Sequence, residues 1–337
     1  MHKFLFALCG ALFACVLSAA QVNDLYQGMA PTSGDMTAAQ SQALSEVLVK
    51  VSGKRDILAQ PDVVKALAAP KEYVQQYGYQ DEGQVKILKA QFVPAKVNAL
   101  IAGSKYALLG PARPQLAFWL VQDDGERRII SDQSGDGWSP VLRSQAQTLG
   151  LPVSIPLMDL DDSMAVSATD VWGRFAGPIL KASQRYGAEM VVLGQLVAQG
   201  EGWALNWALY GPKSGATEQL TKGEVQGSQQ EIATGLADAL AGWLVENYGA
   251  RLGGVSSSQA LQIEGVQGID DMISLQKLLQ GMASVTQVTI GQLNGDKVNF
   301  SLTLQGDRAE LIRGLELEPR LKRLPDEGNL RYQWSQP

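Results

Sequence analysis

The chain has 337 residues, of which 45% are hydrophobic and 18% are charged, and its 28 Lys and Arg face 34 Asp and Glu. This composition is typical of a globular protein and excludes a chain that is disordered over most of its length. The net charge of −6, without a long basic cluster, argues against binding to nucleic acid or anionic lipid, because both need a positive surface.

Cysteine and histidine occur only at the start of the sequence, as Cys9, Cys15 and His2. Thiol nucleophiles, Ser-His-Asp triads and zinc sites all depend on these residue types. The rest of the chain retains carboxylates, Ser-Lys pairs and tyrosines as its possible catalytic groups. We therefore expect a protein that is not an enzyme and that binds no cofactor or metal ion.

Residues 1–20 have the pattern of a secretory signal peptide. Lys3 supplies a positive start, residues 4–17 are apolar, and small residues up to Ala20 offer a cleavage site. We expect cleavage after Ala20 and a periplasmic location. Lipid attachment at Cys15 is the alternative, and the bulky Phe13 fits it poorly, so we expect no lipid anchor. No later apolar window is long enough to span a membrane.

The region 21–112 is expected to be an α+β unit. Thr37 and Gln40 form a capping-box pattern that predicts the start of a helix, and Gly53 is expected to end it. Residues 84–93 alternate between apolar and polar side chains, which predicts a strand with one buried face. A proline-rich boundary then precedes the next unit.

The middle domain, 113–250, is predicted to follow the order β-α-β-α-β-β-β-α. The continuous apolar run 116–121 is typical of a strand buried on both faces. Period-2 alternation predicts a core-facing strand that contains Trp203 and Trp207, and apolar residues at helical spacing predict a buried stripe along the last helix. In chain order the expected elements are 116–121, 141–149, 153–157, 171–186, 190–198, 203–210, a strand ending near 225, and 229–248.

Residues 251–258 have the Gly- and Ser-rich composition of a linker, and 259–337 form the expected C-terminal domain. Its pattern predicts β-α-β-β-α-β, the ferredoxin-like order, with Asn294 and Gly295 in a hairpin turn. Alternating apolar residues near position 332 suggest an additional edge strand. The fold class is therefore α/β (α+β), with two to three small mixed-sheet modules.

Two groups of polar residues are the candidate ligand or partner site. Asp159, Asp161 and Asp162 form the densest carboxylate cluster, at the end of a predicted strand where α/β sheets commonly bind ligands. Arg185 and Tyr186 end a predicted helix and are candidates for binding an anion or a partner. The structural alternatives are a capped acidic turn for the first group, and helix-end packing for the second.

Two further motifs resemble functional sites and lack required parts. Residues 132–137 have the start of a calcium loop, but Arg143 occupies the position that needs a glutamate, so a Gly-rich turn is expected. Ser274 and Lys277 match one serine-lysine signature of penicillin-recognising enzymes, but the companion motifs are reversed in order or missing. Neither motif predicts an activity.

Several stretches carry a resemblance to a known family. They are Ala43-Leu44-Ser45-Glu46-Val47-Leu48-Val49-Lys50-Val51-Ser52-Gly53, Arg113-Pro114, Phe118-Trp119-Leu120-Val121, Gly150-Leu151-Pro152, Pro156-Leu157-Met158-Asp159-Leu160-Asp161-Asp162 and Ala182-Ser183-Gln184-Arg185-Tyr186-Gly187-Ala188. Together they resemble DUF2066, an uncharacterised family of secreted proteobacterial proteins, which implies a location but no activity. Residues 179–244 distantly resemble the small α/β domain of TolB-like proteins and envelope assembly lipoproteins, which act by protein contact.

These observations predict a non-catalytic periplasmic accessory or scaffold protein that contacts an envelope protein partner. The alternative is a periplasmic module that binds a glycan or peptide fragment near the carboxylate cluster. A carboxylate-dependent hydrolase is the third hypothesis, since paired carboxylates can divide acid and base roles.

Overall fold

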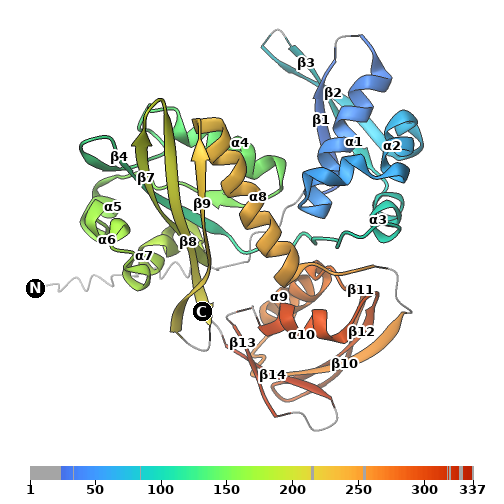
Figure 1. Ribbon diagram of the computed structural model, residues 1–337. Helices are drawn as coiled ribbons and strands as arrows, with labels where there is room; N and C mark the ends of the chain where they lie inside the picture. The colour runs from blue at the N-terminus through green and yellow to red at the C-terminus, as the bar shows by residue number, and fades with distance from the viewer. Residues whose placement is uncertain are drawn as a thin grey trace, which may run out of the picture.

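The computed structural model describes residues 24–32, 34–83, 85–213, 216–252, 256–316, 318, 320–325 and 329–335. The expected signal peptide lies outside these residues. Three β-sheets, each packed against helices, follow one another along the chain, which confirms the mixed α/β class (Figure 1). No helix among the described residues is long and apolar enough to cross a membrane.

The N-terminal module is a three-stranded antiparallel sheet in the order β1-β3-β2, with α1 packed on one face. Its strands are β1 (Gln27–Pro31), β2 (Val74–Glu82) and β3 (Val85–Phe92), and its helices are α1 (Met36–Ser52), α2 (Pro61–Ala68) and α3 (Pro94–Ala102). The predicted buried face of β3 is confirmed, because Leu88, Ala90 and Phe92 are fully enclosed. Two short 3-10 turns, Arg55–Ala59 and Pro70–Glu72, complete the module.

The predicted capping box at Thr37 is wrong, although the helix end is right. Asp35 is the N-cap of α1, and its carboxylate accepts hydrogen bonds from the amides of Thr37 at 2.9 Å and Ala38 at 3.2 Å. The helix starts earlier than predicted, and the first free amides of its N-terminus, those of Thr37 and Ala38, are capped by this aspartate. Gly53 ends the helix with φ 60, a left-handed conformation that glycine adopts without strain.

The middle module has a sheet in the order β5-β4-β7-β8-β9, with β6 paired to β4. Its strands are β4 (Leu116–Asp123), β5 (Arg127–Ile129), β6 (Val153–Ser154), β7 (Met190–Gln199), β8 (Gly202–Lys213) and β9 (Ala216–Gly227), and its long helices are α4 (Trp138–Thr148) and α8 (Gln229–Tyr248). Alternate side chains of β4 enter two different cores, one on each face of the sheet. That double burial explains its uninterrupted apolar run.

The single helix predicted over 171–186 is wrong. The segment consists of α6 (Ala168–Trp172), α7 (Ala176–Ser183) and a 3-10 turn at Gln184–Tyr186, preceded by the short helix α5 (Leu160–Ala165). The chain turns at Arg174, whose φ of 58 cannot continue a helix. The apolar spacing runs through this turn because both pieces pack on the same face of the sheet. The strand predicted over 153–157 is also shorter, as β6.

The C-terminal module has the predicted β-α-β-β-α-β order and one further strand. It contains β10 (Ser257–Glu264), α9 (Ile269–Gly281), β11 (Val285–Asn294), β12 (Lys297–Leu304), α10 (Arg308–Glu316), β13 (Leu321–Arg323) and β14 (Leu330–Trp334). In the sheet order β11-β12-β10-β14-β13, the tail strand β14 lies inside the sheet rather than at its edge. It belongs there because Leu330, Tyr332 and Trp334 are all buried in the core of this module.

Arg113 joins the N-terminal and middle modules from the inside. Its side chain is fully buried, and its guanidinium donates hydrogen bonds to backbone carbonyl oxygens only. These acceptors are Gly110 at 2.9 Å, Leu109 at 3.1 Å, Lys50 at 2.8 Å, Leu149 at 2.9 Å and Gly150 at 2.7 Å. Burial lowers the pKa of Arg113 to about 9, so the side chain remains charged at neutral pH. Its charge lies at the carbonyl ends of α1 and α4, where helix dipoles favour a cation.

Gly150 provides the space for this arginine. Its φ is 65, and a Cβ at this position would lie 2.5 Å from Nη1 of Arg113. Both the backbone conformation and the close approach therefore require glycine.

We expect Gly150→Ala and Arg113→Lys each to lower the free energy of unfolding by about 2–4 kcal/mol. The alanine meets the guanidinium, and lysine has only three N–H donors for carbonyls that now receive five. Urea denaturation measures both changes. Gly177→Ala in α7 is the matched control, since its Cβ meets no atom within 4 Å. An Arg113→Lys variant as stable as the wild type would show that the hydrogen bonds from Arg113 to the five carbonyls do not stabilise the fold.

Candidate functional site

Four of the five predicted site residues meet in one hydrogen-bonded cluster. Asp159 is the N-cap of α5, and Asp162 lies in the first turn of that helix. Arg185 and Tyr186 lie in the 3-10 turn after α7, which packs against α5. We call these four residues the Asp159–Arg185 network. The two candidate groups identified in the sequence are thus halves of a single arrangement.

Arg185 binds both carboxylates of the network. Its Nη1 and Nη2 donate to the two oxygens of Asp159 at 2.8 and 2.7 Å, a bidentate geometry. Nη1 also donates to Oδ1 of Asp162 at 3.0 Å. Bidentate pairing fixes the guanidinium more firmly than a single contact does, so Arg185 holds the start of α5 against the end of α7.

Asp162 is the buried member of the network, with 1% of its side chain exposed. Its Oδ2 accepts hydrogen bonds from the Met158 amide at 3.0 Å and from the Tyr186 hydroxyl. The same hydroxyl oxygen accepts one from the Leu157 amide at 3.0 Å. Asp161 differs, because its side chain is 83% exposed and its carboxylate lies 3.9 Å from Nη1 of Arg185.

The network shifts the pKa values of Asp159, Arg185 and Tyr186. Hydrogen bonds from Arg185 lower the pKa of Asp159 to about 2. Burial, together with the hydrogen bond to Asp162, raises the pKa of Tyr186 to about 12. The pKa of Arg185 is raised by Asp159. Asp159 and Tyr186 are therefore poorly suited to exchange a proton near neutral pH.

Beside the network, α5 presents apolar side chains to solvent. Leu160 and Met164, one turn apart on the helix, are 74% and 79% exposed, and the neighbouring Leu157 is 39% exposed. We call Leu157, Leu160 and Met164 the α5 patch. This patch was not predicted from the sequence, although apolar residues four positions apart after an N-cap aspartate were a visible signal.

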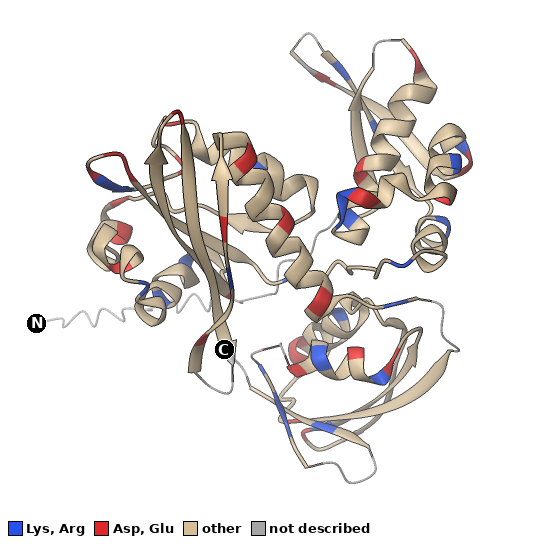
Figure 2. Cartoon of the chain, viewed as in Figure 1, with Lys and Arg blue, Asp and Glu red and all other residues tan. Residues whose placement is uncertain are grey.

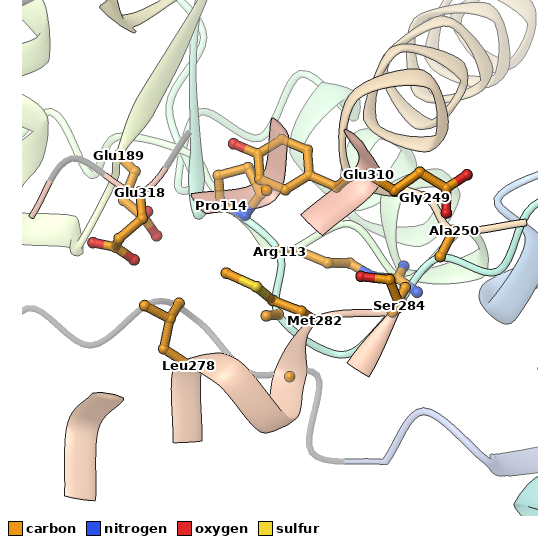
Figure 3. A pocket seen from close by; sticks show the side chains of 15 residues that line it. Arg113, Pro114, Glu189, Gly249, Ala250, Leu278, Met282, Ser284, Glu310 and Glu318 are labelled. Atoms are coloured by element: carbon orange, nitrogen blue, oxygen red, sulfur yellow. The ribbon is translucent and has the colours of Figure 1, made fainter. Parts of the chain in front are cut away.

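A small cavity lies between the middle and C-terminal modules (Figure 3). Arg113, Glu189, Tyr248, Met282 and Glu318 are among the residues that line it. The volume that the centres of water molecules can reach inside it is about 40 Å³, which is room for a few waters.

Two glutamates approach each other at this cavity. Burial and the nearby charge of Glu318 raise the pKa of the half-buried Glu189 to about 7, and the Gln115 amide at 3.3 Å opposes the shift. Burial, Glu189 and Glu318 also raise the pKa of Tyr248. Arg320 pairs with Glu318 through two contacts of 2.6 and 3.0 Å, and its guanidinium lies 4.7 Å from the Trp334 ring centroid.

The other motifs from the sequence have structural roles here. Asp132 pairs with Arg143 at 2.9 Å, so the cation occupies the loop that resembled a calcium site. Trp207 is buried in the main core, and Trp203 packs against the same core. The rings of Trp203 and Trp138 meet edge to face, with their centroids 5.5 Å apart. Within the described part of the chain, no three His, Cys, Asp or Glu side chains are grouped to hold a metal ion. Figure 2 shows charges of both signs interspersed in every module.

A family model described as a domain of unknown function, DUF8605, matches residues 19–110. The match covers the N-terminal module, and the resemblance to DUF2066 is not confirmed by it. No curated protein matches the chain.

Two solved structures share weak similarity with parts of the chain. The hypothetical protein CT253 from Chlamydia trachomatis is matched over 40% of this chain and 100% of its own, with 8% identity and a TM-score of 0.29. The LpoB C-terminal domain from Salmonella enterica is matched over 34% of this chain and 82% of its own, with 15% identity and a TM-score of 0.23. At these TM-scores neither similarity carries an argument about function.

We expect Asp162→Ala to lower the free energy of unfolding by about 2–4 kcal/mol, because it leaves the Met158 amide and Tyr186 hydroxyl without their buried acceptor. Asp161→Ala is the control and is expected to change it by no more than about 0.5 kcal/mol, since that side chain is exposed. Chemical denaturation compares the two. Equal effects would show that the network does not stabilise α5.

Glu189→Gln is expected to stabilise the protein at pH 8 and to have little effect at pH 4. The pKa of Glu189 is about 7 in the folded protein and about 4.5 in the unfolded chain, so the folded protein binds this proton more tightly. The stability that the protonated carboxyl contributes is therefore lost as the pH rises from about 4.5 to 7. The gain at pH 8 is expected to be about 1–3 kcal/mol. Thermal unfolding at both pH values measures it, with the exposed Glu246→Gln as control. An equal gain in stability at pH 4 and pH 8 would contradict the raised pKa of Glu189.

Proposed function

We propose that this chain is a non-catalytic accessory or scaffold protein of the cell envelope, and that it binds a protein partner through the α5 patch. The observation that carries the proposal is the exposure of Leu160 and Met164 on a helix whose position is fixed by the Asp159–Arg185 network. Asp159 and Asp162, two of the three carboxylates in the cluster considered for catalysis, are engaged in holding that helix.

Exposed Leu and Met side chains favour a protein partner over a polar ligand. Large apolar side chains that stand together on a surface gain free energy when a complementary surface removes them from water. The flexible thioether of Met164 adapts to the shape of an apolar partner. Asp161, on the exposed side of the same helix, supplies the polar rim that such interfaces have.

A rigid support for these side chains adds to affinity. Ordering a mobile helix at the moment of binding costs conformational entropy, which subtracts from the gain of the contact. Here two hydrogen bonds from Arg185 to Asp159, and the buried Asp162, hold α5 before any partner arrives. The partner therefore meets a preformed surface.

Features of the sequence support a location for this activity. The signal-peptide pattern over 1–20 and the resemblance to DUF2066 support export to the periplasm and membership of that family, both of which belong to this proposal. A periplasmic module that binds a glycan or peptide fragment is the alternative, and it needs a ligand site beside Asp159.

Photo-crosslinking in living cells of the source organism tests the proposal. A benzophenone amino acid at Met164 is expected to yield one reproducible crosslinked protein, and Leu160→Asp on the same chain is expected to reduce the yield at least about tenfold. The same probe at Ile269, which is 72% exposed on α9, is the matched control and should not capture that protein. Identical products from both positions, or none from Met164, would refute the α5 patch as a partner site.

A further inference from the structure

The strand β2 forms an open edge of the N-terminal sheet. In the order β1-β3-β2 it pairs on one side with β3, the element against which it chiefly packs within the described chain. The β2–β3 hairpin projects from the module at the top of Figure 1. The backbone groups along the outer side of β2 are therefore available to another strand.

This edge lacks the devices that usually prevent strand pairing. Residues 76–80 are all exposed, carry no charge and no proline, and pair regularly with β3, because the irregularity in the register lies before Gln76. Two other described edges are better protected, since β9 carries Glu218, Lys222 and Glu224, and β11 has two register shifts. Charges and bulges of this kind are the common protection of sheet edges.

The same five residues read identically in both directions: Gln76-Tyr77-Gly78-Tyr79-Gln80. Antiparallel pairing of two such segments around a two-fold axis at Gly78 places each Tyr77 opposite the Tyr79 of the other copy, and each Gln76 opposite its Gln80. A two-fold interface requires this self-complementarity, because one surface patch must match itself. No like charges oppose each other within the run.

We infer that β2 pairs with β2 of a second copy of this chain, and that the two N-terminal sheets become one sheet across a two-fold axis at Gly78. Tyr77 and Tyr79 lie on one face, opposite Ala90 and Leu88 of β3, and are 54% and 48% exposed. Their rings already meet edge to face at 6.1 Å. Pairing brings the four rings of the dimer together on that face, and cross-strand aromatic pairs stabilise sheets.

The opposite face is open at the axis. A Cβ added to Gly78 would meet no atom within 4 Å, so two chains can approach there without steric hindrance. Asp81, the nearest charge on β2, lies opposite Lys86 of its own β3. Self-association through β2 involves a different module from the α5 patch and does not depend on the proposed partner.

Single cysteines test the register of this dimer. In the full chain with Cys9→Ser and Cys15→Ser, Gly78→Cys is expected to form a disulfide-linked dimer under mild oxidation, because residues opposite each other across an antiparallel pair are within disulfide reach. Gln76→Cys alone is the matched control and should form the disulfide at least about tenfold more slowly. In the proposed register, position 76 of one copy lies opposite position 80 of the other, so the two introduced cysteines do not face each other. Mixing Gln76→Cys with Gln80→Cys chains should restore rapid crosslinking.

Charge substitutions test the same contact without a covalent bond. Gln76→Lys with Gln80→Lys places lysine opposite lysine, whereas Gln76→Lys with Gln80→Glu places lysine opposite glutamate. Sedimentation velocity from about 1 to 200 µM is expected to show a dimer for the wild type and the Lys/Glu chain, and at least about tenfold weaker association for the Lys/Lys chain. Circular dichroism verifies that both variants fold.

Leu160→Asp, which removes the α5 patch, is expected to leave the dimer intact, so failure of the proposed function and failure of the dimer are distinguishable. A wild-type chain that stays monomeric throughout the concentration range would overturn the inference. So would equal oxidation rates for Gly78→Cys and Gln76→Cys, or a dimer that the Lys/Lys chain retains.

Discussion

Burial of Arg113 among backbone carbonyls is the constraint that relates the N-terminal module to the middle one. A guanidinium removed from water loses much solvation free energy, and here five carbonyl oxygens replace the lost water. These carbonyls come from the last turn of α1, the connection before β4 and the end of α4. The hydrophobic core is continuous across the same junction, with Leu44 of α1 and Phe118 of β4 in one cluster. The C-terminal module has a separate core of its own.

Two arginines thus organise this protein by different means. Arg113 has carbonyl partners alone and lies fully inside, so its role is to set the relative position of two modules. Arg185 lies near the surface and binds Asp159 and Asp162, so it fixes a short helix on one face of one module. The first arrangement is global, and the second is local. Only the second places side chains where another molecule can reach them.

The sequence predicted elements best where a local signal coincided with burial. The helix predicted over 229–248 matches α8, because Ser228 caps it with Glu231 and its apolar stripe enters the core. β2 was missed because its residues 76–80 are all exposed, so the alternation of Tyr77 and Tyr79 does not mark a buried face. All five candidate site residues were visible as two polar groups. Four of them join in one network, and this depends on how α7 packs against α5, across 23 to 26 residues of chain, which no local pattern encodes.

The place of β14 in the C-terminal sheet has a consequence for the order of folding. Residues 261–264 of β10 pair with residues 330–333 of β14, so that side of β10 stays unpaired until the end of the chain reaches it. Pairings so distant in sequence form slowly, because a long loop must close first. A chain that emerges from a ribosome or a translocation pore from its N-terminus would present β10 with an open edge until β14 has followed. During that interval the module is a target for chaperones and proteases, whereas the two preceding modules already possess all their strands.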